Sequence, residues 1–257
     1  MKYSNLTKNL NHYRTLLSNF HHPNYLNKLI EIDPNIGKLK QASVLIPLSF
    51  DSNSQLCFTL TRRSQNLKLF KGECCFIGGN VDKEDKSPLD TALREAYEEV
   101  GMEKQCLDVL CQFKPIFTSH GSIVTPNIAF LDNQKFAPNL NYQEVDLIFK
   151  VPTWIFLENK IHSLSVSRYK NDRVYMHYFK WEHQGQKCLI TGITSTLAIL
   201  ISSILHAKLP EFRFAPDFNL DLHNLNIYLD HLNLIYFFNV VETSIVHARQ
   251  NYTIILP

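Results

Sequence analysis

Residues 87–101 read Ser-Pro-Leu-Asp-Thr-Ala-Leu-Arg-Glu-Ala-Tyr-Glu-Glu-Val-Gly, and this stretch predicts a helix whose two ends are both specified. Ser87 is a good N-cap residue, Pro88 suits the first helical position, and Gly101 stands where a left-handed C-terminal residue is expected. Apolar residues recur along one stripe of the helix, at Leu89, Ala92, Leu93, Ala96 and Val100. We expect this stripe to pack on a sheet.

Strand patterns lie on both sides of this helix. Residues 42–50 and 56–62 are apolar and β-branched, and the polar run 51–54 between them predicts a hairpin turn. Further strands are expected at 73–77, 111–117, 123–131 and 174–181. Further helices are expected at 151–158, at 194–208 and in the last 40 residues. A helix enclosed among strands in this way predicts an α/β or α+β fold.

Composition limits the classes of protein that this chain can represent. With 257 residues, 45% of them hydrophobic, the chain can bury a core as one domain with appendages, which excludes wholesale disorder. The 26 basic and 24 acidic residues leave a net charge of +2, so neither a nucleic-acid nor a membrane partner is indicated. Glycine is scarce, and four of the 8 glycines fall within residues 72–101. This clustering is a first indication of a functional site.

Three further features bear on the cellular setting. Residues 188–205 form the longest uncharged apolar run, but seven of them are Gly, Ser or Thr, so we expect a buried core helix rather than a membrane span. The six cysteines include no Cys-x-x-Cys pair, which favours buried thiols over a zinc site. Residues 1–30 contain no acidic residue and form an amphipathic helical pattern. A mitochondrial transit peptide and a docked N-terminal helix both fit that pattern.

Three glutamates share one side of the predicted helix. Glu95, Glu98 and Glu99 lie within about 100° of one another, beside the apolar stripe rather than opposite it. Three carboxylates so close repel one another, and a divalent cation such as Mg²⁺ would remove that repulsion. Arg94 is expected to pair with Asp90 one turn earlier and with Glu98 one turn later. The alternative is an acidic helix face that is simply solvated.

The stretch Gly79–Met102 resembles the Nudix box, a glycine loop followed by Arg-Glu-x-x-Glu-Glu-x-Gly, which here is residues 94–101. The resemblance implies an α/β/α sandwich with a mixed sheet, in which a loop–helix–loop binds Mg²⁺ or Mn²⁺ and cleaves a diphosphate. The loop is one residue longer than in the common box, and Asp85 and Lys86 occupy the two possible positions of its early glutamate.

The longer loop, with Asp82 and Asp85, resembles the coenzyme A diphosphatase branch of the Nudix hydrolases. The signature of that branch before the box is similar to Leu60-Thr61-Arg62-Arg63-Ser64, Lys68, Gly72 and Phe76-Ile77-Gly78-Gly79. Lys68 replaces the usual arginine and Ile77 the usual proline. The similarity covers roughly residues 40–215. We therefore expect an N-terminal helical extension at 1–39, a Nudix hydrolase domain at 40–215 and a packed C-terminal helical segment at 216–257.

The resemblance implies metal-dependent hydrolysis of coenzyme A or its thioesters to 3′,5′-ADP and a 4′-phosphopantetheine product. Glu95 and Glu99 are the first-choice metal ligands, and Glu98 is a third ligand or the base. Glu144 is a second candidate base, and Arg94 orients the acids. The candidate substrate-binding residues are Arg63 and Lys68, which would contact phosphates, and Gly78 and Gly79, which would let the backbone approach the diphosphate. For the two basic residues, solvated strand-edge charges are the alternative.

Two other functions stay open at this point. The first is a Nudix hydrolase of another nucleoside diphosphate, such as ADP-ribose or a dinucleotide. The second is a non-catalytic Nudix-fold binding module, although such modules typically lose the box glutamates that this chain retains. A small-molecule substrate is expected in either case, and the sequence does not decide between a monomer and a homodimer. Peroxisomal relatives usually end in a Ser-Lys-Leu-like signal. This chain ends in Ile255-Leu256-Pro257, so peroxisome, mitochondrion and cytoplasm all stay open.

Overall fold

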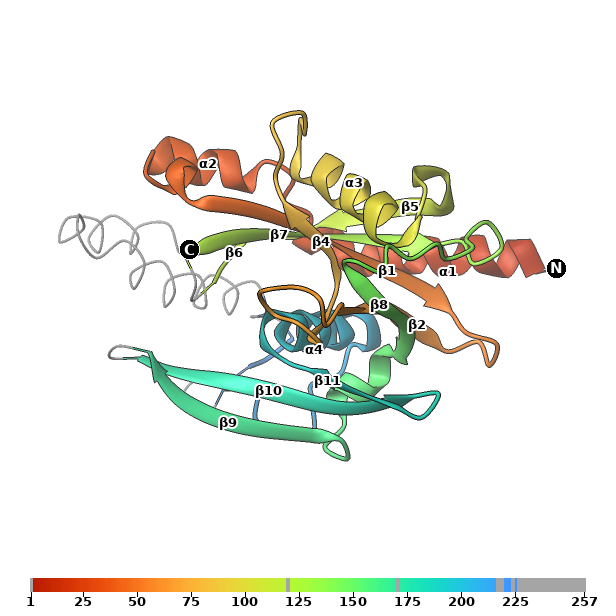
Figure 1. Ribbon diagram of the computed structural model, residues 1–257. Helices are drawn as coiled ribbons and strands as arrows, with labels where there is room; N and C mark the ends of the chain where they lie inside the picture. Colours follow the sequence, from red (N-terminus) through yellow and green to blue (C-terminus); the bar gives the residue numbers. More distant parts are fainter. Residues whose placement is uncertain (1, 119–120, 170–171, 216–219, 223–224, 226–257) are drawn as a thin grey trace.

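The computed structural model describes residues 2–118, 121–169, 172–215, 220–222 and 225, and one mixed sheet organises them (Figure 1). In these residues the 11 strands follow the order β5-β7-β1-β2-β3-β11-β10-β9, and β4, β6 and β8 branch onto β1, β7 and β2. The strands are β1 Lys40–Phe50, β2 Leu56–Arg63, β3 Cys74–Cys75, β4 Ile77–Asn80, β5 Leu107–Gln112, β6 Ile116–Phe117, β7 Ser122–Leu131, β8 Val145–Pro152, β9 His162–Tyr169, β10 Asp172–His183 and β11 Gln186–Ile190. The α-helices are α1 Lys2–Leu17, α2 Tyr25–Ile32, α3 Pro88–Val100 and α4 Gly192–His206.

Strand β1 makes the sheet mixed, because it pairs in parallel with β7 and antiparallel with β2 and β4. The turn between β1 and β2 has a local cause. The Asp51 carboxylate accepts hydrogen bonds from the backbone N–H groups of Asn53 and Gln55, at 2.9 and 2.8 Å. An Asx-type turn of this kind reverses the chain. The predicted hairpin at 51–54 is therefore confirmed.

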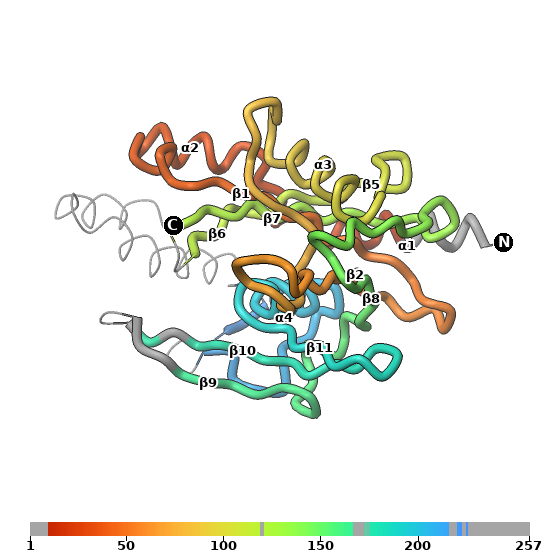
Figure 2. Tube along the Cα trace, viewed as in Figure 1, coloured from red at the N-terminus to blue at the C-terminus, as the bar shows by residue number. Residues whose placement is uncertain are grey.

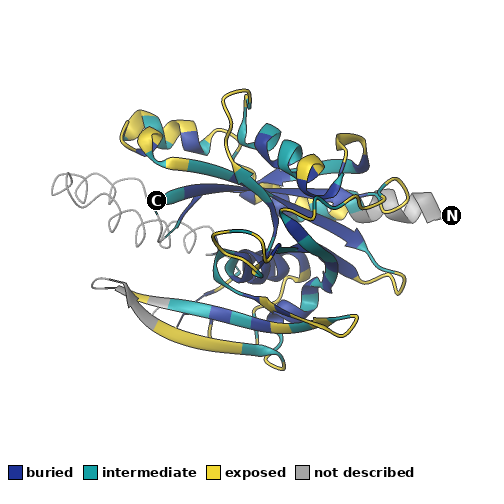
Figure 3. Ribbon diagram, viewed as in Figure 1, coloured by how far each residue is buried: buried dark blue, intermediate teal, exposed yellow. Residues whose placement is uncertain are grey.

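Both faces of the sheet are covered around β1, as the dark-blue strands between the helices in Figure 3 illustrate, whereas much of β9 is exposed. On one face, Leu45 of β1 packs in a cluster with Ala92 and Ala96 of α3. On the other, Ile46 packs in a larger cluster that includes much of α4. Successive residues of a strand point to opposite faces, so this alternation places β1 in the middle layer. The predicted α/β fold with a mixed central sheet is confirmed.

Helix α3 begins and ends where the sequence predicted. The Ser87 hydroxyl accepts a hydrogen bond from the backbone N–H of Asp90 at 3.2 Å. At the other end Gly101 has a φ of 69°, in the left-handed region, and its N–H bonds the Tyr97 carbonyl at 2.9 Å. A side chain is unfavourable in this conformation, which explains the glycine. The two caps hold the register of the acidic residues between them.

The N-terminal helix lies against the sheet. Leu17 is fully buried in the cluster that contains α4, and the Arg14 guanidinium forms an ion pair with Asp108 of β5. The docked helix that the sequence allowed is thus observed. The predicted domain boundaries and the targeting role of this segment stay predictions, as does the helix at 216–257, which lies almost entirely outside the described residues. The tube in Figure 2 traces the same arrangement.

Helix α4 matches the prediction of a buried core helix, since eleven of its residues are buried. Among the described residues no helix combines the length and the apolar character that crossing a membrane requires. Of the six cysteines, all free thiols, Cys75 is half-buried and the others are buried.

Several predicted elements differ from those observed. The helix predicted at 151–158 is observed only in part: β8 continues to Pro152 because it pairs with β2, and a short 3-10 helix follows at Thr153–Leu157. The strand predicted at 111–117 is divided, because β5 ends at Gln112 and β6 starts at Ile116. The strand predicted at 73–77 is likewise two short strands, β3 and β4. Strands β9 and β11 and helix α2 were not predicted.

Candidate active site

Three carboxylates converge at the inner face of α3. One carboxylate oxygen from each of Glu95, Glu99 and Glu144 lies within 4.8 Å of the others. Glu95 and Glu99 stand one turn apart on α3, and Glu144 precedes β8. Among the described residues this is the one group of acidic, histidine or cysteine side chains close enough to hold a metal ion.

Glu99 is the most deeply placed of the three, with 2% of the residue exposed. Burial, together with the neighbouring Glu95 and Glu144 charges, raises the pKa of its carboxyl to about 8, against the opposing effect of Arg63. Burial also raises the pKa of Glu95. Both shifts arise because negative charges are crowded where water is excluded.

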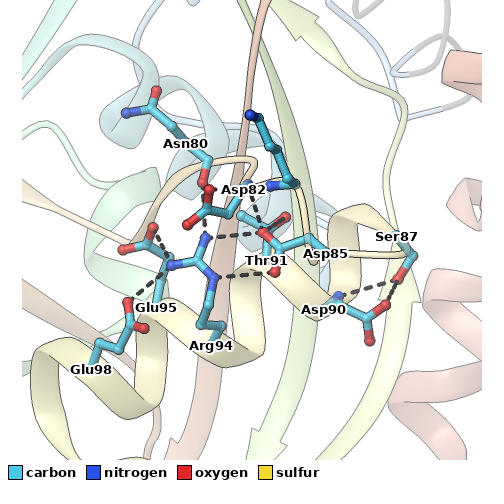
Figure 4. A network of polar contacts seen from close by, with 10 residues as sticks. Asn80, Asp82, Asp85, Ser87, Asp90, Thr91, Arg94, Glu95 and Glu98 are labelled. Carbon is cyan, nitrogen blue, oxygen red and sulfur yellow. Dashed lines mark hydrogen bonds and ion pairs between the residues drawn. The ribbon is translucent and has the colours of Figure 1, made fainter.

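Arg94 organises the outer side of the cluster (Figure 4). Its guanidinium donates to Asp85 through Nε at 3.1 Å and Nη2 at 3.0 Å, and Nη2 also reaches the Asn80 carbonyl at 2.9 Å. The Nη1 group donates to Glu95 at 3.0 Å and to Glu98 at 2.9 Å. The hydrogen bonds from Arg94 hold the pKa of Asp85 at about 2, well below its usual range. One fixed cation therefore orients three carboxylates.

The predicted pairing of Arg94 with Asp90 was wrong, whereas the pairing with Glu98 is observed. The Asp90 carboxylate accepts instead from the Ser87 hydroxyl at 2.9 Å, within the helix cap. Asp85 takes its place on Arg94, and its Oδ2 also accepts from the Thr91 hydroxyl at 2.9 Å. The sequence signal for this role was the alignment of Asp85 with the missing early glutamate.

Glu98 lies apart from the three converging carboxylates. Its side chain is 50% exposed and its contact is with Arg94. An open pocket of about 460 Å³ lies on this side of the helix, lined by Tyr97, Glu98 and Asn141 among others. The structure thus brings Glu144, rather than Glu98, to Glu95 and Glu99. The roles predicted for Glu98 as ligand or base stay predictions.

The loop that carries Glu144 is attached to the C-terminal end of α3. The backbone N–H groups of Asn139 and Asn141 donate to the carbonyls of Val100 and Glu99, each at 2.9 Å. The Asn141 side chain donates to a Glu144 carboxylate oxygen at 3.0 Å. Helix carbonyls that would otherwise lack partners therefore position the third carboxylate. Sequence reasoning missed both asparagines.

Gly78 and Gly79 belong to strand β4 rather than to a loop, and each permits a close approach. A Cβ at Gly78 would lie 2.2 Å from the backbone oxygen of Ser43 on the paired strand. A Cβ at Gly79 would lie 2.4 Å from Oε1 of Glu95. Gly78 thus permits sheet pairing, and Gly79 leaves room for a candidate ligand. Their contact with substrate stays a prediction.

The two predicted phosphate-binding residues are differently placed. Arg63, at the end of β2, lies close enough to Glu99 to lower the pKa of that carboxyl. Its Nε is buried and has no hydrogen-bond partner among the described residues. Lys68 is exposed, in the loop that follows β2. The structure therefore brings Arg63 to the acidic cluster and leaves Lys68 at the surface.

The residues present fit a divalent cation. Glu99 Oε2 is buried without a hydrogen-bond partner in the described part of the chain, which is costly for a carboxylate. Oxygen ligands from several carboxylates are what Mg²⁺ and Mn²⁺ prefer. A cation between Glu95, Glu99 and Glu144 would remove both the crowding and the unmatched atom.

Comparison with known proteins agrees with this geometry. The NUDIX domain model matches residues 39–146, a span that contains α3 and all the acidic residues described above. The chain is 36% identical over 185 residues to Peroxisomal coenzyme A diphosphatase NUDT7 of Mus musculus, covering 71% of this chain and 76% of that protein. It is 32% identical over 199 residues to Peroxisomal coenzyme A diphosphatase ndx-8 of Caenorhabditis elegans, covering 76% and 81%.

A third relative is matched over a smaller part of its length. The chain is 32% identical over 181 residues to "Nudix hydrolase 15, mitochondrial" of Arabidopsis thaliana, covering 70% of this chain and 64% of that protein. Nudix hydrolases act on small molecules and generally use divalent ions such as Mg²⁺ or Mn²⁺. The domain match, the identities to these relatives and the capped acidic helix lead to one conclusion: this chain belongs to the Nudix hydrolase family.

Proposed function

We propose that this protein is a metal-dependent diphosphatase that hydrolyses coenzyme A or acyl-CoA. The products are 3′,5′-ADP and 4′-phosphopantetheine or its acylated form. The observation that carries the diphosphatase activity is the convergence of Glu95, Glu99 and Glu144, in which one buried Glu99 oxygen has no hydrogen-bond partner within the described part of the chain. The substrate is supported by the branch-specific residues before the box and by the names of the two peroxisomal relatives.

In this proposal Glu95, Glu99 and Glu144 hold Mg²⁺ or Mn²⁺. The bound cation supplies neutralisation of the diphosphate charge and a lowered pKa for water. Arg94 holds Glu95 and Glu98 in place through its bonds to Asp85 and the Asn80 carbonyl. Arg63 and Lys68 contact phosphate oxygens. Arg63 is the stronger candidate, because its buried Nε has no hydrogen-bond partner among the described residues and its positive charge lowers the pKa of Glu99.

The reaction adds water across the diphosphate. A bond forms between the water oxygen and one phosphorus, and the bridging P–O bond breaks, so that each product carries a terminal phosphate. Glu98 is a candidate base, since its half-exposed carboxylate is held by the same Arg94 guanidinium that bonds Glu95. Glu144 is the other candidate, and its side chain is steadied by Asn141.

A substrate panel with product identification tests the proposal. Coenzyme A, ADP-ribose and NADH are each incubated with the wild-type chain and Mn²⁺, and the products are identified by mass spectrometry. Release of 3′,5′-ADP from coenzyme A, at a kcat/KM at least tenfold above that for the other two substrates, is expected. A preference for ADP-ribose or NADH would replace coenzyme A as substrate, and hydrolysis of none would favour a binding module.

Glu99→Gln, with Glu103→Gln as a matched control on an exposed residue beyond α3, links any activity to this site. Loss of one candidate ligand should lower kcat by two or more orders of magnitude, roughly the scale expected for removing a key charge-stabilising group. Wild-type activity in Glu99→Gln would contradict the assignment of the site.

A further inference from the structure

Residues 64–73 connect β2 to β3, and we call this segment the 64–73 loop. It carries two adjacent apolar side chains that are exposed to solvent. Leu69 is 69% exposed and Phe70 is 48% exposed, and Lys68 and Lys71 on either side of them are also exposed. Phe70 has a φ of 55°. A bulky side chain in this left-handed region is uncommon and costs energy, and such residues are concentrated at ligand-binding sites.

The base of the loop is closed by hydrogen bonds of Arg63. Its backbone N–H donates to the Glu73 carbonyl, and its carbonyl accepts from the Gly72 N–H, both at 2.9 Å. Gly72 has a φ of 74°, and a Cβ there would lie 2.5 Å from Nε2 of Gln65. These hydrogen bonds hold the two ends of the 64–73 loop together.

This base is also part of the acidic site. The positive charge of the Arg63 side chain lowers the pKa of Glu99. The backbone N–H of Ser64 donates a hydrogen bond to the Glu144 carbonyl at 2.8 Å. Figure 1 shows the loop in orange near the centre of the view, and the strand before it, β2, pairs with both β3 and β8. Leu69 and Phe70 are thus only six or seven residues in sequence from Arg63, whose positive charge lowers the pKa of Glu99. The exposed apolar residues Leu164 and Val166 lie elsewhere, on β9, the last strand in the described sheet order.

We propose that Leu69 and Phe70 form a subsite for an apolar arm of the substrate, the acyl chain of an acyl-CoA. This inference rests on the proposed function. An acyl chain laid on these side chains would remove apolar surface from water, and each fully buried methylene group strengthens binding about fourfold. Lys68 and Lys71 supply positive charge, which complements a ligand that carries phosphates. Free coenzyme A lacks the arm, so the subsite selects among thioesters by chain length.

Binding measured without divalent metal separates this subsite from catalysis. Isothermal titration calorimetry in EDTA gives the Kd of coenzyme A, hexanoyl-CoA and dodecanoyl-CoA, with the acyl forms below their micelle concentrations. For the wild-type chain we expect dodecanoyl-CoA to bind at least about tenfold more tightly than coenzyme A, since part of the chain is buried. In the double variant Leu69→Ser/Phe70→Ser this ratio should approach one. Leu164→Ser/Val166→Ser, a matched exposed pair on β9, should keep the wild-type ratio.

Each outcome of these binding measurements supports or overturns the acyl-chain subsite. A wild-type ratio near one, or an unchanged ratio in Leu69→Ser/Phe70→Ser, overturns the subsite. If the ratio behaves as expected but no coenzyme A ester is hydrolysed with Mn²⁺, the subsite stands and the proposed function fails. Sedimentation with phosphatidylcholine–phosphatidylserine vesicles tests a membrane contact. Loss of vesicle binding in the double variant, with an unchanged Kd ratio, would overturn the subsite in favour of a membrane surface.

Discussion

Arg94 and Asp85 are joined by two hydrogen bonds, although they are nine positions apart in the sequence. The side chain of Asp85 is 5% exposed and that of Arg94 is 26% exposed, so the pair is shielded on the carboxylate side. The same guanidinium continues to Glu95 and Glu98. Asp85 therefore affects the carboxylate cluster indirectly: it fixes Arg94, and Arg94 in turn fixes Glu95, a candidate metal ligand.

Asp85→Asn should lower activity while leaving the fold intact, because Arg94 loses its charged anchor and Glu95 its fixed partner. Residues that orient metal ligands typically contribute about 10–100-fold to affinity or activity, and we expect a loss of that size. Steady-state kinetics with Mg²⁺ titration measures the effect. Glu84→Gln, an exposed residue of the same loop, is the control. Wild-type kinetics in Asp85→Asn would show that Arg94 needs no anchor.

Glu99 gives the metal-free protein a characteristic pH dependence. Its folded-state pKa of about 8 lies above the ordinary 4.5, so the folded protein binds this proton more tightly than the unfolded chain. The contribution to stability is therefore present below pH 4.5 and is lost as pH rises through about 8. In urea unfolding with EDTA, wild type should lose stability over this range relative to Glu99→Gln.

Metal should reverse this trend, because a carboxylate ligand must be deprotonated to bind. The stabilisation by Mg²⁺ is expected to increase between pH 5 and pH 8 in wild type and in Glu103→Gln, and to be much smaller in Glu99→Gln. Equal Mg²⁺ stabilisation in all three proteins would remove Glu99 from the ligand set.

The two glycines of β4 should respond differently to alanine. At Gly79 the added Cβ meets the flexible end of Glu95, which can move, so Gly79→Ala should fold normally and lose at least tenfold in kcat. At Gly78 the Cβ meets the backbone of β1, which cannot move without breaking the strand pair. Gly78→Ala should therefore lower the free energy of unfolding by about 1–3 kcal/mol, as overpacking does. Thermal unfolding and kinetics on both variants distinguish the two effects, and a stable, fully active Gly79→Ala would contradict the close approach to Glu95.

A histidine pair beneath α4 should make the fold sensitive to mild acid. His162 of β9 and His177 of β10 are joined at 2.9 Å between Nε2 and Nδ1, and His177 Nε2 lies 2.9 Å from the Phe214 carbonyl. Burial lowers the pKa of each to about 4 from the usual 6.5. The pair's contribution to stability is therefore present above pH 6.5 and lost as pH falls through about 4.

His177→Gln tests this pair. The variant should be less stable at pH 7, by roughly 1–3 kcal/mol for a buried group deprived of a partner, and its stability should fall less between pH 6.5 and 4. His183→Gln, on the same strand but outside the pair, should show the wild-type change in the free energy of unfolding between pH 6.5 and 4. If the free energy of unfolding of His177→Gln fell with pH as steeply as that of the wild type, the acid sensitivity would belong to other groups.

Local signals predicted helix α3 well, because its caps and its apolar stripe act within a few residues. They missed β8, which pairs with β2 over most of its length, and they extended the helix that follows it back into the strand. The acidic site shows the same contrast between local and tertiary determinants. Glu95 and Glu99 follow from helical spacing, whereas the position of Glu144 depends on hydrogen bonds between its loop and the end of α3. Spacing along one helix could not reveal that tertiary contact.

The backbone bond from Ser64 to Glu144 has a consequence for how such an enzyme can diversify. It joins the carboxylate site to the base of the 64–73 loop through main-chain atoms alone, so no side chain at the tip is needed to keep the site assembled. Substitutions at Leu69 or Phe70 can therefore accumulate without disturbing the hydrolytic residues. A fold with this division can acquire new substrates by drift at a few surface positions while its chemistry is preserved.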